Sequence, residues 1–180
     1  TEALTSVAFQ APAGACDAHF HVFGPADQYP YHGALRYQPP LAPWSEYQKL
    51  AQHLGISRHV LVQPSAYGRD NRCMLDVMAT LPRHSTRGIV DMEDHTPSSE
   101  LERMHALGVR GIRINVSPVH PVQEGLFESM LPRIQLWDAR CHELGWHLDF
   151  LLPGWLTERM LAVFDRLRVH HSPAHMVMFK

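Results

Sequence analysis

Two histidines one residue apart, within residues 17–23, are the side chains of this chain best placed to do chemistry. Alternate positions of a β-strand project from the same face, so a strand over this segment directs His19 and His21 into one site. Neutral imidazole is a common metal ligand and an acid–base group near neutral pH. The pair can therefore hold a divalent metal ion or flank a substrate carbonyl. The alternative is an incidental pair in a chain that has 14 histidines.

Arg113 and Ser65 are candidate ligand-binding residues. Arg113 alternates with apolar neighbours in residues 111–116 and so points to the polar face of a strand. A buried guanidinium must meet an anion, and its planar fork matches a carboxylate. A substrate carboxylate satisfies this requirement, and so does an internal salt bridge with Asp149 or Asp91. Ser65 follows the second expected strand and can donate to a carboxylate, whereas the missing Gly-x-Ser-x-Gly context disfavours a nucleophile.

The elements that must position these residues alternate along the chain. Three helical patterns end in Leu-Gly, at Gly55, Gly108 and Gly145, and each is followed by a strand pattern, as expected of a left-handed glycine after a helix. Ser45 with Gln48, and Ser99 with Glu102, have capping-box spacing. We expect strands over residues 16–22, 59–63, 87–92, 111–116, 147–152 and 172–176, and helices over 45–54, 70–81, 98–107, 126–144 and 156–167.

This alternation predicts a parallel sheet with helices outside. The expected strands at 111–116 and 147–152 have polar residues at alternate positions. This pattern favours a barrel with the site at its mouth, rather than a doubly wound sheet. His147 lies on the same face of its expected strand as Asp149 and can line the interior of the barrel. The favoured interpretation is a histidine packed in the core. The long segment 24–43 is rich in Pro and Tyr, and we interpret it as an ordered flap over the site.

Composition indicates a single soluble domain over residues 1–180. The chain is 45% hydrophobic and 19% charged, with a formal net charge of −2, which gives no reason to expect a nucleic-acid partner. No apolar run approaches the length that spans a bilayer, so we expect a cytoplasmic protein without a membrane partner. The three cysteines, Cys16, Cys73 and Cys141, fit reduced thiols better than a disulfide framework.

Several motifs, in chain order, carry a family resemblance. They are the run at residues 17–25, Tyr29-Pro30-Tyr31, Arg36-Tyr37, Gln63-Pro64-Ser65-Ala66-Tyr67-Gly68 with Asp70-Asn71, Arg110-Gly111-Ile112-Arg113, and His175-Met176. Together they resemble the amidohydrolase superfamily, in particular its 2-pyrone-4,6-dicarboxylate lactonase-like group.

The resemblance implies a TIM-barrel fold and a hydrolase that opens the lactone ring of a small carboxylated substrate in aromatic-compound catabolism. It implies that the catalytic residues His19, His21 and His175 surround the reacting carbonyl. It also implies that Tyr37, Ser65 and Arg113 bind the carboxylates and ring oxygens of the substrate. A zinc-dependent decarboxylase of the same superfamily and an inactive ligand-binding remnant are the alternatives.

No cofactor is favoured. Binuclear members of the superfamily bridge two metals with a modified lysine or a glutamate of the fourth strand, but this chain has only Lys49 and Lys180, outside the expected strands. The resembling group includes metal-independent enzymes. A single zinc with His19, His21 and His175 as ligands is the alternative.

The sequence departs from the family in two places. Val177 stands where the family usually has Gly, and only about six of eight strand-helix units are recognised, so the barrel is expected to be incomplete at the C-terminus and to lack the aspartate of the eighth strand. We therefore expect weak or absent hydrolysis by the 180-residue chain alone, and a homo-oligomer that pairs exposed sheet edges.

Overall fold

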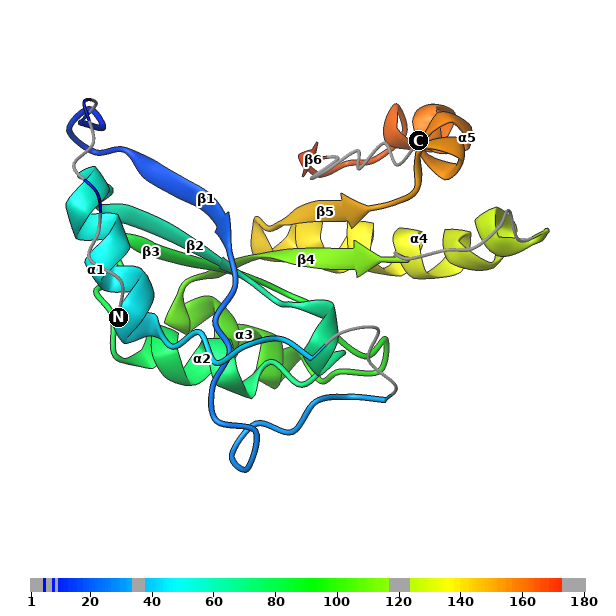
Figure 1. Cartoon of the computed structure of the whole chain (residues 1–180). Coiled ribbons are helices and arrows are strands. Elements are labelled where there is room, and N and C mark those ends of the chain that lie inside the picture. Colours follow the sequence, from blue (N-terminus) through cyan, green and yellow to red (C-terminus); the bar gives the residue numbers. More distant parts are fainter. Residues whose placement is uncertain (1–4, 6–7, 9, 34–37, 117–123, 173–180) are drawn as a thin grey trace. The chain divides into compact units, whose positions relative to one another are not determined.

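The computed structural model describes residues 5, 8, 10–33, 38–116 and 124–172. Strands and helices alternate along this part of the chain (Figure 1). The strands are β1 (Cys16–Phe20), β2 (Arg58–Val62), β3 (Thr86–Val90), β4 (Val109–Asn115), β5 (His147–Leu151) and β6 (His171–Ser172). The helices are α1 (Trp44–Leu54), the short 3-10 helix η1 (Ser65–Tyr67), α2 (Arg72–Ala79), α3 (Ser98–Leu107), α4 (Leu126–Leu144) and α5 (Gly154–Phe164).

The chain divides into two compact units. The first comprises residues 1–88 and 106–108, and the second comprises residues 89–105 and 109–180. In the first unit β1 and β2 pair in parallel, with Asp17 opposite His59. The backbone N–H of His59 donates to the carbonyl of Ser85, 2.9 Å away, which connects β2 to the segment that leads into β3.

The core of the first unit lies between its strands and α2. Leu61, Met74 and Met78 are almost fully buried there. A Cβ atom at Gly88 would lie 2.6 Å from the sulfur of Met78, closer than real contacts allow. Glycine in β3 therefore lets α2 pack directly against the backbone of that strand.

In the second unit β4, β5 and β6 form parallel pairs in that order. Arg113 lies opposite Asp149 in the register of β4 and β5. Ile112, Ile114, Leu148 and Phe150 of these strands are buried with side chains of α4 and α5, among them Ile134, Trp137 and Leu156. The observed fold is thus α/β with parallel strands joined through helices, as predicted.

Helix ends show where local prediction succeeded and where it was wrong. Gly55 and Gly145 adopt left-handed φ angles of 76° and 64° after α1 and α4, which confirms the Leu-Gly signals. Both predicted capping boxes are wrong, because Ser45 and Ser99 lie inside α1 and α3. In both cases the carbonyl of a preceding proline, at position 43 or 97, accepts the first helical N–H groups.

The last predicted strand differs most from the structure. It was expected over residues 172–176, whereas β6 covers His171–Ser172 and residues 173–180 lie outside the described part of the chain. Within the described residues, no helix combines the length and the apolar character needed to cross a membrane.

Candidate functional site

His19 and His21 lie together at the carboxyl end of β1. Their ring centroids are 5.1 Å apart and the rings meet edge to face. Both side chains are half-buried. The prediction that the two imidazoles lie close together is confirmed, but β1 ends at Phe20, so His21 lies one residue beyond the strand that was expected over residues 16–22.

The backbone around the pair is shaped by Asp17. One carboxylate oxygen of Asp17 accepts the backbone N–H of His19 at 3.0 Å, a local bond that draws the chain out of regular pairing. The register between β1 and β2 shifts between Asp17 and Phe20 accordingly. The other oxygen accepts the hydroxyl of Tyr47, at 2.9 Å, from helix α1. Asp17 therefore connects the histidine strand to the helix beside it.

Tyr47 supports the same strand from α1. Its ring stacks on Phe20 with a centroid distance of 3.8 Å and an interplanar angle of 3°. Burial, followed by the hydrogen bond to the Asp17 carboxylate, raises the pKa of the Tyr47 hydroxyl well above its usual value. Tyr47 is therefore a neutral hydrogen-bond donor over the whole range in which histidine titrates. Sequence reasoning did not assign a role to Asp17 or Tyr47.

The orientation of His21 is set by β2. Its Nδ1 lies 2.8 Å from the carbonyl oxygen of Val62. A carbonyl oxygen can only accept, so Nδ1 carries the proton and the neutral ring has its lone pair on Nε2. In this form Nε2 can accept a proton or coordinate a metal ion. It can stabilise an oxyanion by hydrogen bonding only after it has been protonated.

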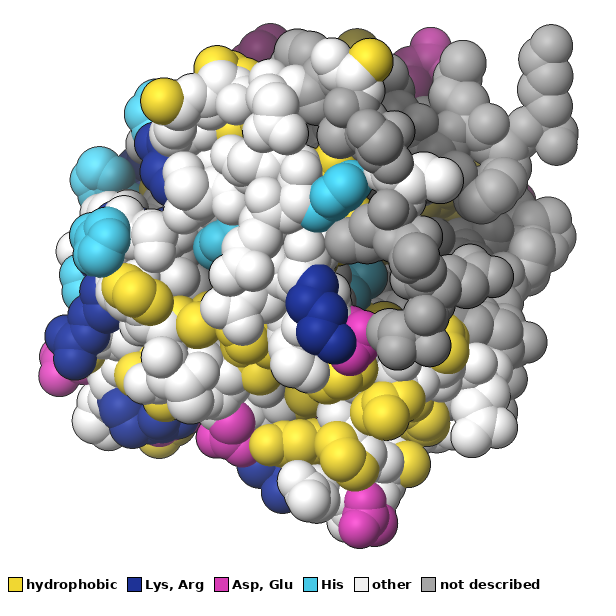
Figure 2. Space-filling view, turned by 60° about the vertical axis from the view of Figure 1, so that its left-hand side comes forward, with side chains coloured by type: hydrophobic (Ala, Val, Ile, Leu, Met, Phe, Trp, Pro, Cys, Tyr) yellow, Lys and Arg dark blue, Asp and Glu magenta, His cyan; other side chains and the backbone are white. Residues whose placement is uncertain are grey.

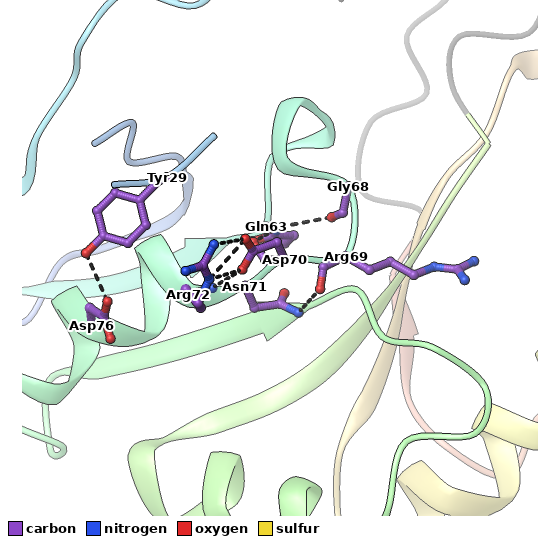
Figure 3. Close-up of polar contacts among 8 residues, drawn as sticks. All are labelled: Tyr29, Gln63, Gly68, Arg69, Asp70, Asn71, Arg72 and Asp76. Carbon is purple, nitrogen blue, oxygen red and sulfur yellow. Dashed lines mark hydrogen bonds and ion pairs between the residues drawn. The ribbon is translucent and has the colours of Figure 1, made fainter. Parts of the chain in front are cut away.

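The loop after β2 holds Ser65, which is exposed at the start of η1. Gln63 is 2% exposed and its side-chain nitrogen donates to the carbonyls of Gly68 and Asp70, each at 2.9 Å (Figure 3). The side-chain nitrogen of Asn71 donates to the carbonyl of Arg69 at 2.9 Å. These bonds keep the Ser65 loop in one conformation. The family motif contains Gln63, but its bracing role is visible only in the folded loop.

The segment after β1 packs on the same loop. The backbone N–H of Gly24 donates to the hydroxyl of Tyr67 at 3.1 Å, and the rings of Tyr31 and Tyr67 stack with centroids 5.4 Å apart. The N–H of His32 donates to the carbonyl of Ala66 at 2.8 Å. The described part of segment 24–43 next to β1 thus packs on the loop after β2, and its interpretation as a flap stays a prediction. Tyr37, the predicted substrate-binding residue of this segment, lies outside the described residues.

Arg113 and Asp149 form a buried ion pair in the second unit. The Nε of Arg113 lies 3.3 Å from a carboxylate oxygen of Asp149, and the side chains are 4% and 2% exposed. Burial lowers the pKa of Arg113, while the carboxylates of Asp149 and Asp91 oppose this change. The internal salt bridge, one of the two partners that the sequence left open, is therefore present. The paired register of β4 and β5 places both residues on one face of the sheet.

Arg133 was missed by sequence reasoning. From α4 it donates to the carboxylate of Asp91 at 2.9 Å and to the carbonyl of Met92 at 2.8 Å, and it also pairs with Asp94. Trp137, one turn further along α4, donates to the same Asp94 at 3.0 Å. Arg133 thus connects α4 to the residues that follow β3. The spacing of four residues between Arg133 and Trp137 was the available signal, since such residues share one helix face.

The predicted set of three histidines extends beyond the described residues, because His175 lies outside them. Within the described ranges, no group of three His, Cys, Asp or Glu side chains is arranged to hold a metal ion. His19 and His21 supply two imidazoles from positions separated by one residue, which fits two nitrogen ligands of a zinc ion.

Comparisons with known proteins agree with this arrangement of motifs. A family model described as Amidohydrolase matches residues 16–176. The chain is 34% identical over 142 residues to a 2-pyrone-4,6-dicarboxylate hydrolase of Comamonas testosteroni, covering 78% of this chain and 44% of that protein. It is 37% identical over 145 residues to a 4-sulfomuconolactone hydrolase of Hydrogenophaga intermedia, covering 79% and 46%.

The fold also matches a solved structure. An apo crystal structure of an Agrobacterium tumefaciens protein superposes with a TM-score of 0.75 at 26% identity, covering 90% of this chain and 56% of that one. The chain spans about half the length of the curated relatives it matches.

Proposed function

Because the chain belongs to the amidohydrolase family, we propose that its protein opens the lactone ring of a small carboxylated substrate in the breakdown of aromatic compounds. Two relatives named as lactone hydrolases support this substrate class. The observation that carries the proposal is the His19–His21 pair, with rings 5.1 Å apart at the end of β1. We also propose that the strands belong to a (β/α)8 barrel and account for about six of its eight units.

His21 is the proposed acceptor of a proton from the attacking water. Its Nδ1–H is held by the Val62 carbonyl, so Nε2 presents the lone pair. A neutral imidazole in this tautomer is a general base near neutral pH. His19, with His175, polarises the lactone carbonyl and stabilises the negative charge that develops on its oxygen.

Tyr37, Ser65 and Arg113 are the proposed substrate-binding residues. Ser65 exposes its hydroxyl on a loop that Gln63 braces, which supports a fixed donor for a carboxylate or ring oxygen. Arg113 is paired with Asp149, and its planar guanidinium matches the geometry of a substrate carboxylate.

We propose catalysis without a metal, and a single zinc at His19, His21 and His175 is the alternative. A zinc ion at these residues would polarise the carbonyl as a Lewis acid. Metal analysis of the purified protein separates the two cases. Activity that survives a chelator in protein free of stoichiometric zinc supports the proposal, whereas stoichiometric zinc with activity abolished by the chelator contradicts it.

The reaction is tested with the complete protein that contains this chain. 2-Pyrone-4,6-dicarboxylate and 4-sulfomuconolactone are incubated with it, and the loss of lactone absorbance is followed. We expect His21→Asn to lower kcat about 10²–10⁴-fold, the range for loss of a general base. His142→Asn, at an exposed position of α4, is the matched control and should retain wild-type activity. Turnover of simple amides without turnover of lactones, or release of CO₂, would overturn the assignment.

The proposed partner is the small carboxylated lactone alone, with no nucleic acid or membrane, and the proposed location is the cytoplasm. A formal net charge of −2 supports the proposal that nucleic acid is not a partner. Electrophoretic mobility of a DNA fragment that is unchanged by the protein would agree with it.

A further inference from the structure

A pocket of about 150 Å³ lies in the first unit, at the amino ends of its strands. Its polar lining residues come from the starts of β1, β2 and β3 and from the turn before β3. They are Cys16, Arg58, His59, His84, Ser85 and Arg87. Among the described residues, no Asp or Glu contributes to this lining. The pocket therefore combines two permanent positive charges with hydroxyl and imidazole groups.

Both arginines of the pocket are held in place by backbone carbonyls. The Nε of Arg58 donates to the carbonyl of Gly14 at 2.6 Å. One terminal nitrogen of Arg87 donates to the carbonyl of Thr86 at 2.8 Å and also to that of Arg83. Within the described chain, the polar partners of the two guanidinium groups are thus neutral. Their charge is not neutralised by a carboxylate, and each retains N–H groups for an anion.

The nearby carboxylate of Asp17 keeps its negative charge and acts on His59, but it forms no ion pair with Arg58 or Arg87 among the described residues. Asp17 is the strand neighbour of His59, but its two oxygens accept the N–H of His19 and the hydroxyl of Tyr47. Tyr47 lies between the carboxylate and the imidazole, since its hydroxyl is 3.4 Å from Nδ1 of His59. On the face drawn in Figure 2, histidine and Lys or Arg side chains gather along the left-hand edge, with an Asp or Glu side chain beside them.

We propose that this pocket binds a small oxoanion of the phosphate or sulfate class. Two guanidinium groups preorganised by carbonyls, beside the imidazoles of His59 and His84, are an arrangement that recognises such an anion. The pocket is lined by the first residue of β1, Cys16, whereas His19 and His21 lie three and five residues further along the chain, at the other end of the strand. The site is thus separate from the proposed lactone chemistry and does not rest on it.

Cys16 provides a direct reporter of occupancy. Its thiol is exposed and lines the pocket, whereas Cys73 and Cys141 are buried. A thiol reagent should therefore label Cys16 first, and a Cys16→Ser variant confirms the assignment. Bound phosphate should slow this labelling in a saturable manner. Sodium chloride at matched ionic strength is the control, since screening alone acts equally with both salts.

The affinity for inorganic phosphate is then measured by titration calorimetry at constant ionic strength. We expect Arg58→Gln, at an exposed position, to raise the Kd at least tenfold, because one charge-assisted contact is lost. Arg103→Gln in α3 removes the same charge outside the pocket and should leave the Kd unchanged. Titration with acetate distinguishes a tetrahedral oxoanion from any carboxylate.

Three results would overturn the proposal. The first is equal protection of Cys16 by chloride and phosphate. The second is wild-type phosphate affinity in the Arg58→Gln/Arg87→Gln double variant. The third is an affinity for acetate equal to that for phosphate, which would assign the pocket to carboxylates instead.

Discussion

Removal of the Asp149 carboxylate should destabilise the protein far more than removal of an exposed carboxylate. In Asp149→Asn the buried guanidinium of Arg113 loses its ion pair with Asp149, while the Asp91 carboxylate still favours its charged form. At 3.3 Å and an effective dielectric constant of about 20, the lost attraction is roughly 5 kcal/mol. Breaking one partner of a buried pair typically costs about 3–5 kcal/mol, and we expect a loss in that range.

The assay is urea unfolding followed by circular dichroism. Glu128→Gln is the matched control, because it breaks the exposed pair between Glu128 and Arg159 and should cost at most about 1 kcal/mol. The double variant Arg113→Met/Asp149→Leu should recover most of the lost stability, since neither charge is then buried. A free energy of unfolding for Asp149→Asn within about 1 kcal/mol of that of wild type would refute the reasoning. So would a double variant as unstable as the single one, because packing rather than charge would then explain the loss.

The remaining predictions concern the Ser65 loop, His147 and association. Gln63→Ala removes both hydrogen bonds to the loop carbonyls and should lower the free energy of unfolding by about 1–3 kcal/mol. Hydrogen exchange in residues 65–70 should become faster. Unchanged exchange would show that Gln63 does not hold the loop in place. Burial lowers the pKa of His147 below its ordinary value, so the unfolded chain binds the proton more readily. Neutral His147 therefore contributes to the free energy of unfolding above about pH 6.5. This contribution is lost as the pH falls through the lower pKa that His147 has in the folded state. Urea midpoints from pH 8 to 5 should show this fall, and His147→Gln should flatten it. We also expect the 180-residue chain to self-associate through sheet edges, and light scattering that shows a stable monomer would contradict this.

Much of the fold was predictable because its signals are local. Gly55 and Gly145 end helices through their own left-handed conformation, and no distant residue is needed for that. Helices over residues 98–107 and 126–144 have the predicted bounds. The capping boxes failed although they too are local signals, because both helices begin one residue before the serine. The carbonyls of Pro43 and Pro97, two residues before Ser45 and Ser99, accept the first helical N–H groups.

The candidate site was predictable only as far as spacing within one strand determines it. The one-residue gap between His19 and His21 keeps their rings close together, although β1 ends between them, at Phe20. Which nitrogen of His21 carries the proton depends on Val62, 41 residues away in the sequence. The choice between substrate and Asp149 as a partner of Arg113 likewise depends on the register of β4 with β5.

The sequence by itself thus determined the order of the elements, the ends of several helices and the pairing of the two histidines. Only the tertiary structure decided the tautomer of His21, the ion pair of Arg113 and the brace that Gln63 forms. The physical reason is that hydrogen bonds and ion pairs require atoms within a few ångströms. Local periodicity shows which face a side chain occupies, whereas strand register and loop conformation decide which polar atom it meets there.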